Sequence, residues 1–250
     1  MSFFILILGL IIGSFLNVCI YRIPREESIS YPPSHCTNCG YNLKTLDLVP
    51  VISYIFLKGR CRSCKDNISI SYPLIEILNG VLYIIIFKSY GLSLKSVFFT
   101  LFTSLLIVIS LIDFDTKEVY TKTTIFGAIL GIVYIFIGYF YGDINYIDNL
   151  LGGLVGFLII FSIVKITGGM GEGDYEISAI CGLFLGVKGI VVGLFLAIVL
   201  GGIYGIMLLI FKFKDRKDEI AFGPFIAIGT IISMLYMQQI LDFYMRFFYF

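Results

Sequence analysis

The sequence predicts an all-α polytopic membrane protein with about eight transmembrane helices and a polar insert after the first helix. Hydrophobic residues make up 58% of the 250 residues and charged residues only 14%, against about 25% charged in soluble domains. Apolar runs of roughly 20 residues recur, the length that a helix needs to cross about 30 Å of hydrocarbon. These runs are continuous, which excludes the short alternating segments of a β-barrel.

The first apolar run, about Phe3–Ile20, is expected to be the first transmembrane helix. The residues that follow it contain no small-residue cleavage site, so the run is not a cleavable signal peptide. Within it, Gly13 permits close packing against another helix. Asn17 needs a hydrogen-bond partner because its amide would otherwise be unsatisfied in an apolar surrounding.

Residues 21–72 form a polar insert that is too long to be a simple turn. It contains two Cys-x-x-Cys pairs, Cys36 with Cys39 and Cys61 with Cys64, separated by 21 residues. Two such pairs are typical of a tetrahedral Zn²⁺ site with four thiolate ligands. Four ligands leave no open position, so the zinc is expected to be structural and to contribute to the folding of the insert.

Seven further spans follow the insert in a membrane domain, 73–250. Hydropathy places them near 73–88, 95–112, 123–141, 149–166, 176–187, 189–211 and 221–241. The sixth of the eight spans is short and only Lys188 separates it from the next, so the two are either a tilted span and its neighbour or one broken helix.

The distribution of basic residues predicts the orientation. Eight spans divide the connecting segments into two sets, and one set carries 14 of the 18 Lys and Arg residues. That set, expected to be cytoplasmic, comprises Tyr21–Ser71, Asp113–Lys122, Lys165–Asp174 and Lys212–Glu219. Both termini and the acids Asp143, Asp148 and Asp242 are then outside. The net charge of +1 says nothing about partners, and no nucleic-acid partner is expected.

Two acids stand at the cytoplasmic ends of predicted spans. Asp113 ends the third span, and Asp174 follows a loop with four glycines in seven residues, Gly168–Asp174. Two carboxylates at one membrane depth can share a proton and activate a water, as in an aspartyl protease. Asp115 competes with Asp113, because the two point about 200° apart on a helix and only one can face the interior. The alternative is that the acids only cap helix ends.

A series of motifs in order along nearly the whole chain resembles the type IV prepilin peptidases, bifunctional leader peptidases and N-methyltransferases in the GxGD group of intramembrane aspartyl proteases. The motifs are Gly13-Ser-Phe-Leu-Asn17, Tyr21-Arg22-Ile-Pro24, the two cysteine pairs, Val49-Pro50-Val-Ile-Ser53-Tyr54, Gly59-Arg-Cys61, Ile68-Ser-Ile-Ser71-Tyr72-Pro73-Leu-Ile-Glu76, Ile112-Asp113-Phe-Asp115-Thr-Lys, Gly169-Met170-Gly171-Glu-Gly173-Asp174, and Phe222-Gly223-Pro224-Phe225 with Gly229.

The resemblance implies that Asp113 and Asp174 are the catalytic aspartates and that Gly171 and Gly173 belong to the active-site loop. The chain departs from the family at two positions, with Tyr120 in place of the usual Pro and Glu176 in place of a Lys. The second departure removes a cation near Asp174 and adds an anion, but neither departure removes a catalytic group.

The implied reaction is cleavage of a prepilin or pseudopilin after the last Gly of its short basic leader, in the bacterial cytoplasmic membrane. The new N-terminal amine would then be methylated from S-adenosylmethionine. No glycine-rich cofactor loop is present, and the methyltransferase part is therefore assigned to the zinc insert, with Glu76 and Arg22 as further candidates for methyltransfer or substrate binding.

Two alternatives stay open at this stage. The first is a peptidase without methyltransferase activity, in which the zinc insert grips the leader. The second is an ion-coupled transporter whose paired acids bind a cation or proton, although transport gives no reason for a zinc insert and the halves show no convincing repeat. The sequence specifies neither the particular prepilin nor an oligomeric state.

Overall fold

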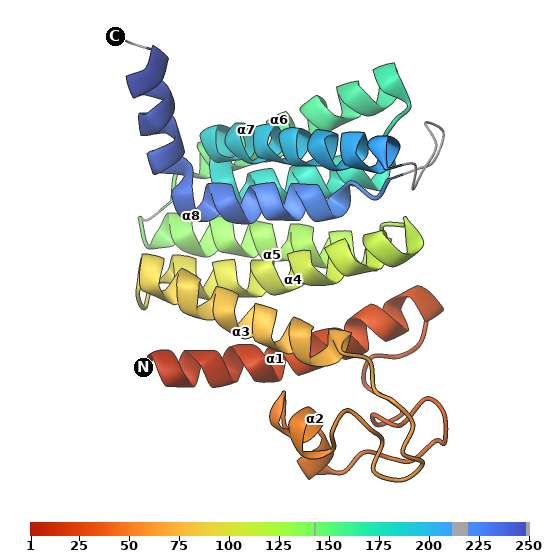
Figure 1. Ribbon diagram of the computed structural model, residues 1–250. Coiled ribbons are helices and arrows are strands. Elements are labelled where there is room, and N and C mark those ends of the chain that lie inside the picture. Colours follow the sequence, from red (N-terminus) through yellow and green to blue (C-terminus); the bar gives the residue numbers. More distant parts are fainter. Residues whose placement is uncertain (143, 212–219, 249–250) are drawn as a thin grey trace. The chain divides into compact units, whose positions relative to one another are not determined.

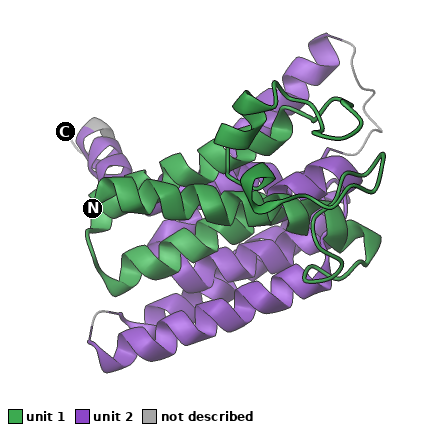
Figure 2. Ribbon diagram, turned by 90° about the horizontal axis from the view of Figure 1, so that it is seen from below, with its two compact units in different colours: residues 1–108 green, residues 109–250 purple. Residues whose placement is uncertain are grey.

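The computed structural model describes residues 1–142, 144–211 and 220–248 (Figure 1). Over these ranges the chain forms helices and two isolated β-bridges, with no extended strand, which confirms the predicted all-α class. Seven of the described helices are long and apolar enough to cross a membrane. The chain divides into two compact units, residues 1–108 and 109–250 (Figure 2). The division into 1–20, 21–72 and 73–250 stays a prediction.

Unit 1 consists of two long helices, the insert between them and most of a third helix. Its elements are α1 (Ser2–Arg22), the 3₁₀ turns η1 (Ile23–Arg25) and η2 (Thr45–Asp47), α2 (Ile52–Phe56), α3 (Ser71–Tyr90) and the first part of α4 (Leu94–Thr116). Apart from α2 and the 3₁₀ turns, the segment between α1 and α3 is irregular.

Helices α1 and α3 pack closely because glycines line their contact. A Cβ atom added to Gly9 would lie 2.7 Å from the Cα of Gly80, and one added to Gly13 would lie 2.7 Å from the Cα of Glu76. The expected packing role of Gly13 is therefore confirmed. The side chain of Asn17 donates to the carbonyl of Tyr72 at 3.2 Å, which supplies the partner that its amide required.

A second polar cluster lies deeper in the same unit. Asn79 is fully buried and donates to the carbonyl of Gly9 at 2.7 Å, while its side-chain oxygen accepts from Ser104 at 2.8 Å. The hydroxyls of Tyr83 and Ser104 are 2.9 Å apart. These bonds connect α1, α3 and α4 through side chains that are costly to leave unpaired in an apolar interior.

Unit 2 contains the end of α4 and four further helices. They are α5 (Thr121–Phe140), α6 (Tyr146–Thr167), α7 (Gly173–Ile210) and α8 (Gly223–Phe248). Helix α7 packs against α5, α6 and α8, again with glycines at close contacts: a Cβ on Gly152 would lie 2.5 Å from the carbonyl oxygen of Gly182.

Helix α7 breaks at Gly186, where φ is +69° and ψ is −178°. A positive φ of this kind is tolerated by glycine and strained in other residues. The chain folds back there: a Cβ on Gly156 of α6 would contact both the carbonyl of Ser178 and the side chain of Ile190. In a straight helix these residues would lie about 18 Å apart. The two halves therefore form a hairpin (Figure 1).

The expected count of eight separate spans is not confirmed by the described residues. The predicted spans 176–187 and 189–211 are the two halves of α7, so the broken-helix alternative is the one that the structure shows. Hydropathy could not distinguish these alternatives because apolar residues continue through the break. Among the residues used for the orientation, Asp143 and Lys212–Glu219 lie outside the described ranges.

Candidate active site and metal centre

Asp113 lies in the last turn of α4 and is only 4% exposed. Its Oδ2 accepts the backbone N–H of Gly223, the first residue of α8, at 2.8 Å. The free N–H groups at a helix N-terminus favour a negative charge, which offsets part of the cost of burying this carboxylate. Asp115, two residues later, is exposed.

Asp174 is the second residue of α7 and is 3% exposed. Its Oδ2 accepts the N–H of Gly171 at 3.0 Å, and its own N–H donates to the carbonyl of Gly171 at 3.2 Å. The acid thus closes the glycine loop onto the start of the helix. Gly173 leaves room for a neighbouring side chain, since a Cβ atom there would overlap the side chain of Val119.

The two acids come from distant parts of unit 2, yet their carboxyl groups interact electrostatically with one another. Both are buried, and each accepts a backbone N–H from a glycine. Such a pair favours a state in which one carboxyl carries a proton and the other does not. This is the arrangement that general acid–base chemistry on a bound water requires.

In unit 1, the four cysteines of the insert come together. The sulfur atoms of Cys36, Cys39, Cys61 and Cys64 all lie within 4.8 Å of one another, and the sulfurs of Cys36 and Cys64 are 3.8 Å apart. Tetrahedral zinc with bonds of about 2.3 Å places its sulfur ligands about 3.8 Å apart. The four residues therefore fit a metal ion of this kind without rearrangement.

The two cysteine turns have the same backbone pattern. In the first, the N–H of Gly40 donates to the carbonyl of Cys36, and in the second the N–H of Lys65 donates to that of Cys61. The N–H groups of Cys64 and Ser63 hydrogen-bond to the Cys61 sulfur and lower the pKa of that thiol. A thiolate is the form that binds metal.

An ion pair supports the second turn. The side chain of Asp47 is 1% exposed and its Oδ1 lies 2.7 Å from Arg62 Nη2. Burial opposes the charge of Asp47, but the hydrogen bonds from Arg62 and from the Lys44 N–H hold the pKa of that carboxyl below its ordinary value. Arg62 adjoins Cys61, so this pair fixes the backbone next to a ligand.

A cavity of about 420 Å³ lies between the insert and the adjoining ends of α1 and α3. Its walls combine aromatic and polar side chains, among them Asn17, Tyr54, Tyr72 and the two further candidates, Glu76 and Arg22. The volume lies in the range of small-molecule sites, about 300–1,000 Å³.

Both further candidates are already hydrogen-bonded within unit 1. Glu76 Oε2 accepts the N–H of Val51 at 2.7 Å, and Arg22 donates to the carbonyls of Ser28 and Pro32 at 2.9 and 2.8 Å. Arg22 therefore holds the start of the insert against the end of α1.

The sequence did not predict the roles of two residues, one beside the carboxyl pair and one beside the cysteine cluster. Gly223 stands out in the sequence only as part of a motif, yet its N–H donates to Asp113. Asp47 was not singled out, although it is a buried acid between the cysteine pairs. Its only signal in the sequence was that it and Asp66 are the only acids between Glu27 and Glu76, in a segment rich in basic residues.

Comparison with known proteins agrees with these features. The model of the bacterial peptidase A24 N-terminal domain matches residues 7–90, and that of the type IV leader peptidase family matches residues 100–206. A prepilin leader peptidase/N-methyltransferase of Pseudomonas putida is 32% identical over 94% of this chain and 90% of its own length. The enzyme of that name from Bacillus subtilis is 33% identical over 96% of each chain.

A third relative of the same name, from Dichelobacter nodosus, is 32% identical over 95% of this chain and 92% of its own length. No solved structure matches the chain. The two family models follow one another along the chain, and the identity extends over nearly its full length. The chain therefore belongs to the type IV leader peptidase family and is a multi-pass membrane peptidase.

Proposed function

We propose that the chain cleaves the leader from type IV prepilins or pseudopilins with Asp113 and Asp174 as the catalytic pair. The observation that carries this proposal is that two buried carboxyl groups, one from α4 and one from α7, lie close enough for the charge of one to act on the other. The names of the relatives supply the substrate class. A serine or cysteine nucleophile paired with a histidine base is excluded from unit 2, because the only histidine of the chain, His35, belongs to unit 1.

In the proposed reaction, the ionised carboxyl removes a proton from a water while the water oxygen attacks the carbonyl carbon after the leader's last Gly. The protonated carboxyl gives its proton to the carbonyl oxygen, which produces a tetrahedral diol. As the diol collapses, the C–N bond breaks, one diol hydroxyl gives its proton to the second carboxyl, and the proton held by the first carboxyl passes to the leaving amine. Both carboxyls thereby return to their starting states. The N–H groups of Gly171 and Gly223 hold the two carboxyls in place.

The proposed location is the cytoplasmic face of the bacterial cytoplasmic membrane, with both termini outside. The support is that the connecting segments on this side together carry 14 of the 18 Lys and Arg residues, seven of them in Tyr21–Ser71. A basic leader would remain on that side while its hydrophobic helix enters the membrane. Membrane lipid is then the second partner of the chain.

The test is leader cleavage in membranes that contain Asp113→Asn, Asp174→Asn or Asp115→Asn. Asn keeps the size of Asp but cannot act as a base, so we expect the first two variants to lose at least about 100-fold in rate. Asp115→Asn is the matched control, since Asp115 is exposed on the same helix end. Loss of activity in Asp115→Asn alone would assign the catalytic acid to that residue, and full activity in all three would overturn the aspartyl mechanism.

We further propose that the insert binds one structural Zn²⁺ through its four cysteines and that the adjoining cavity of unit 1 binds S-adenosylmethionine. That compound, when bound, supplies an electrophilic methyl group for an N-terminal amine. The cavity residues suit it chemically, because the aromatic residues Tyr54 and Tyr72 and the acid Glu76 are among those that line the cavity. A cationic sulfonium is stabilised by both kinds of group.

A pair of variants on α2 tests this cavity directly. Ser53 lines the cavity, whereas Ile52 is 54% exposed on the other side of the helix. We expect Ser53→Trp to fill the cavity and weaken the binding of S-adenosylmethionine, measured by calorimetry, by at least about 10-fold, and Ile52→Trp to preserve it. Equal binding by both variants would exclude this cavity, whatever the result for peptide cleavage.

A further inference from the structure

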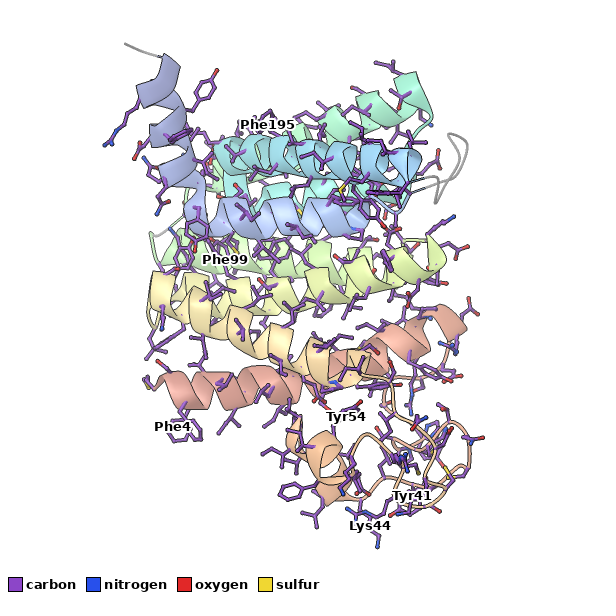
Figure 3. The ribbon with its side chains drawn as sticks, in the orientation of Figure 1. Phe4, Tyr41, Lys44, Tyr54, Phe99 and Phe195 are labelled. Atoms are coloured by element: carbon purple, nitrogen blue, oxygen red, sulfur yellow. The ribbon has the colours of Figure 1, made fainter. Side chains whose placement is uncertain are left out.

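Helix α2 has two different faces. Ser53 and Tyr54 of the helix, and Leu57 directly after it, line the cavity of unit 1. The Tyr54 hydroxyl donates to the carbonyl of Ile68 at 3.3 Å; Figure 3 labels Tyr54. Large apolar side chains occupy the opposite face and are exposed by 54%, 66% and 83% at Ile52, Ile55 and Phe56, respectively. Such a group of adjacent exposed apolar residues indicates contact with a partner or a membrane.

The position of α2 along the membrane normal favours a membrane over a protein partner as the contact of this apolar face. The N–H of Val51, immediately before α2, binds the carboxylate of Glu76 at 2.7 Å. Glu76 lies five residues after the first residue of α3 (Ser71–Tyr90), about 7.5 Å along the helix axis. The 20 residues of α3 are only just enough to span about 30 Å of hydrocarbon. An α3 that spans the hydrocarbon with its full length puts the bond between Val51 and Glu76, and with it the start of α2, at the edge of the apolar layer.

The conformation before α2 holds it at that depth. Val51 has a φ of +61°, a strained value for a β-branched residue. The hydrogen bond of 2.7 Å from its N–H to the Glu76 carboxyl offsets part of this strain. Glu76 thereby joins the insert to the membrane-spanning helix, and a change of depth of α2 would break this bond.

The charges around α2 match an anionic lipid surface. No acidic residue occurs between Asp47 and Asp66, and this interval contains Lys58, Arg60, Arg62 and Lys65. Lys58 and Arg60, directly after α2, are exposed. An apolar face followed by basic residues is the pattern of a helix that lies in the membrane interface.

We propose that α2 is an interfacial anchor, with Ile52, Ile55 and Phe56 in the acyl region of the leaflet where α3 begins and Lys58 and Arg60 among anionic headgroups. The opposite face of the same helix is a wall of the cavity. The lipid therefore helps to hold that wall in position. This inference concerns a lipid contact of the insert and does not depend on the proposed chemistry.

The absence of tryptophan from the chain permits a direct test with single-tryptophan proteins in nanodiscs of brominated phosphatidylcholine, which quenches only fluorophores among its acyl chains. Phe56→Trp reports on α2. Phe4→Trp, at a residue of α1 that is 72% exposed, is the lipid-facing reference. Tyr41→Trp, in the first cysteine turn, is the reference for the part of the insert in water. Figure 3 labels Phe4 and Tyr41.

We expect Phe56→Trp to show blue-shifted emission and a loss of intensity comparable to that of Phe4→Trp, and Tyr41→Trp to be scarcely quenched. Phosphatidylglycerol in the nanodisc should increase quenching at position 56 and leave position 4 unchanged. Quenching of Phe56→Trp no stronger than that of Tyr41→Trp would overturn the proposal. A blue shift that occurs without bromine quenching and disappears on dilution would assign the apolar face to contact with a second copy of the chain. That result would also overturn the proposal. If Phe56→Trp does not fold, Ile55→Trp reports on the same face.

Discussion

The Asp113 carboxylate is held by a glycine 110 residues later in the chain, and this contact requires that the residue have no side chain. A Cβ atom on Gly223 would lie 2.7 Å from Asp113 Oδ2. We predict that Gly223→Ala displaces the carboxylate and lowers leader cleavage by about 10- to 100-fold, because a shift of about 1 Å in a catalytic group has effects of this size. Gly202→Ala is the matched control, since nothing lies within 4 Å of a Cβ there. Equal rates for both variants would contradict the positioning role of Gly223.

A second residue-scale prediction concerns Asp47. Because the pKa of Asp47 is lowered in the folded insert, its stabilising effect is complete above its ordinary pKa, about 3.9, and is lost as the pH falls through the lowered value. At neutral pH, Asp47→Asn should therefore destabilise the metal-loaded insert by about 1 kcal/mol, a modest value because Arg62 is half-exposed. Hydrogen exchange of residues 26–70 measures the effect, with the exposed Asp66→Asn as control. A loss that varied between pH 6 and 8 would contradict this assignment.

At the residue scale, Asp113 and Asp174 could be singled out from the sequence, but the glycine N–H that binds Asp113 could not. Asp113 and Asp174 stand out because carboxylates are rare and costly beside membrane spans. Gly223 does not stand out, because the chain has 26 glycines and most of them serve helix packing or turns. Which glycine must leave room for a carboxylate depends on contacts between α4 and α8 that local sequence does not encode.

At the scale of elements, the two cysteine turns are near-copies separated by 25 positions along the chain. The bridge between His35 and Asn42 corresponds to that between Arg60 and Asn67. Gly40, with a φ of +70°, corresponds to Lys65, with a φ of +62°. Lysine in this conformation costs about 1 kcal/mol relative to glycine.

We therefore predict that Lys65→Gly raises the stability of the metal-loaded insert by about 0.5–1 kcal/mol, and that Gly40→Lys lowers it by a similar amount. Nothing lies within 4 Å of a Cβ on Gly40, so the effect there is one of backbone conformation alone. Resistance of the insert to a zinc chelator is the measurement. Destabilisation by Lys65→Gly would show that the lysine side chain makes a contact that outweighs its strained backbone.

The hairpin of α7 depends on a residue in the neighbouring helix. The break at Gly186 deprives the preceding carbonyls of helical partners, and Asn149 of α6 donates to those of Leu183 and Phe184 at 2.7 and 3.4 Å. We predict that Asn149→Ala lowers the stability of unit 2 by about 1–3 kcal/mol, the cost of unpaired buried polar groups. Thermal unfolding in detergent measures it, with Asn145→Ala, at the exposed end of α6, as a reference for loss of a simple cap. An unchanged midpoint for Asn149→Ala would refute the role of this contact.

The membrane spans could be predicted because a continuous apolar run is visible in the local sequence without any knowledge of tertiary contacts. The sequence permits a bend in α7 without fixing its position, since glycines occur at 182, 186, 189 and 193 and each permits a break. Tertiary packing selects which glycine bends, because the two halves of the hairpin pack against Gly152 and Gly156 of α6.

For the molecule as a whole, the two proposed activities fall in different compact units. Unit 1 holds the cysteine cluster and the cavity, and unit 2 holds Asp113 and Asp174. Several walls of the cavity come from the irregular insert, which has few helical hydrogen bonds of its own. Metal binding can contribute on the order of 10 kcal/mol to the folding of such a segment.

Removal of the metal should therefore separate the activities. We predict that Cys64→Ser, or prolonged chelation of the wild type, releases the proposed metal, exposes residues 26–70 to protease and lowers the affinity for S-adenosylmethionine by at least about 10-fold. Prepilin cleavage, the activity proposed for Asp113 and Asp174, should persist. The control is Cys19→Ala, which removes a buried cysteine of α1 that is not among the four clustered thiols. If peptide cleavage fell in parallel with methyl-donor binding, the result would indicate that the insert also binds the leader of the substrate. A protein that bound the methyl donor normally without its metal would show that the cavity does not depend on the cysteine cluster.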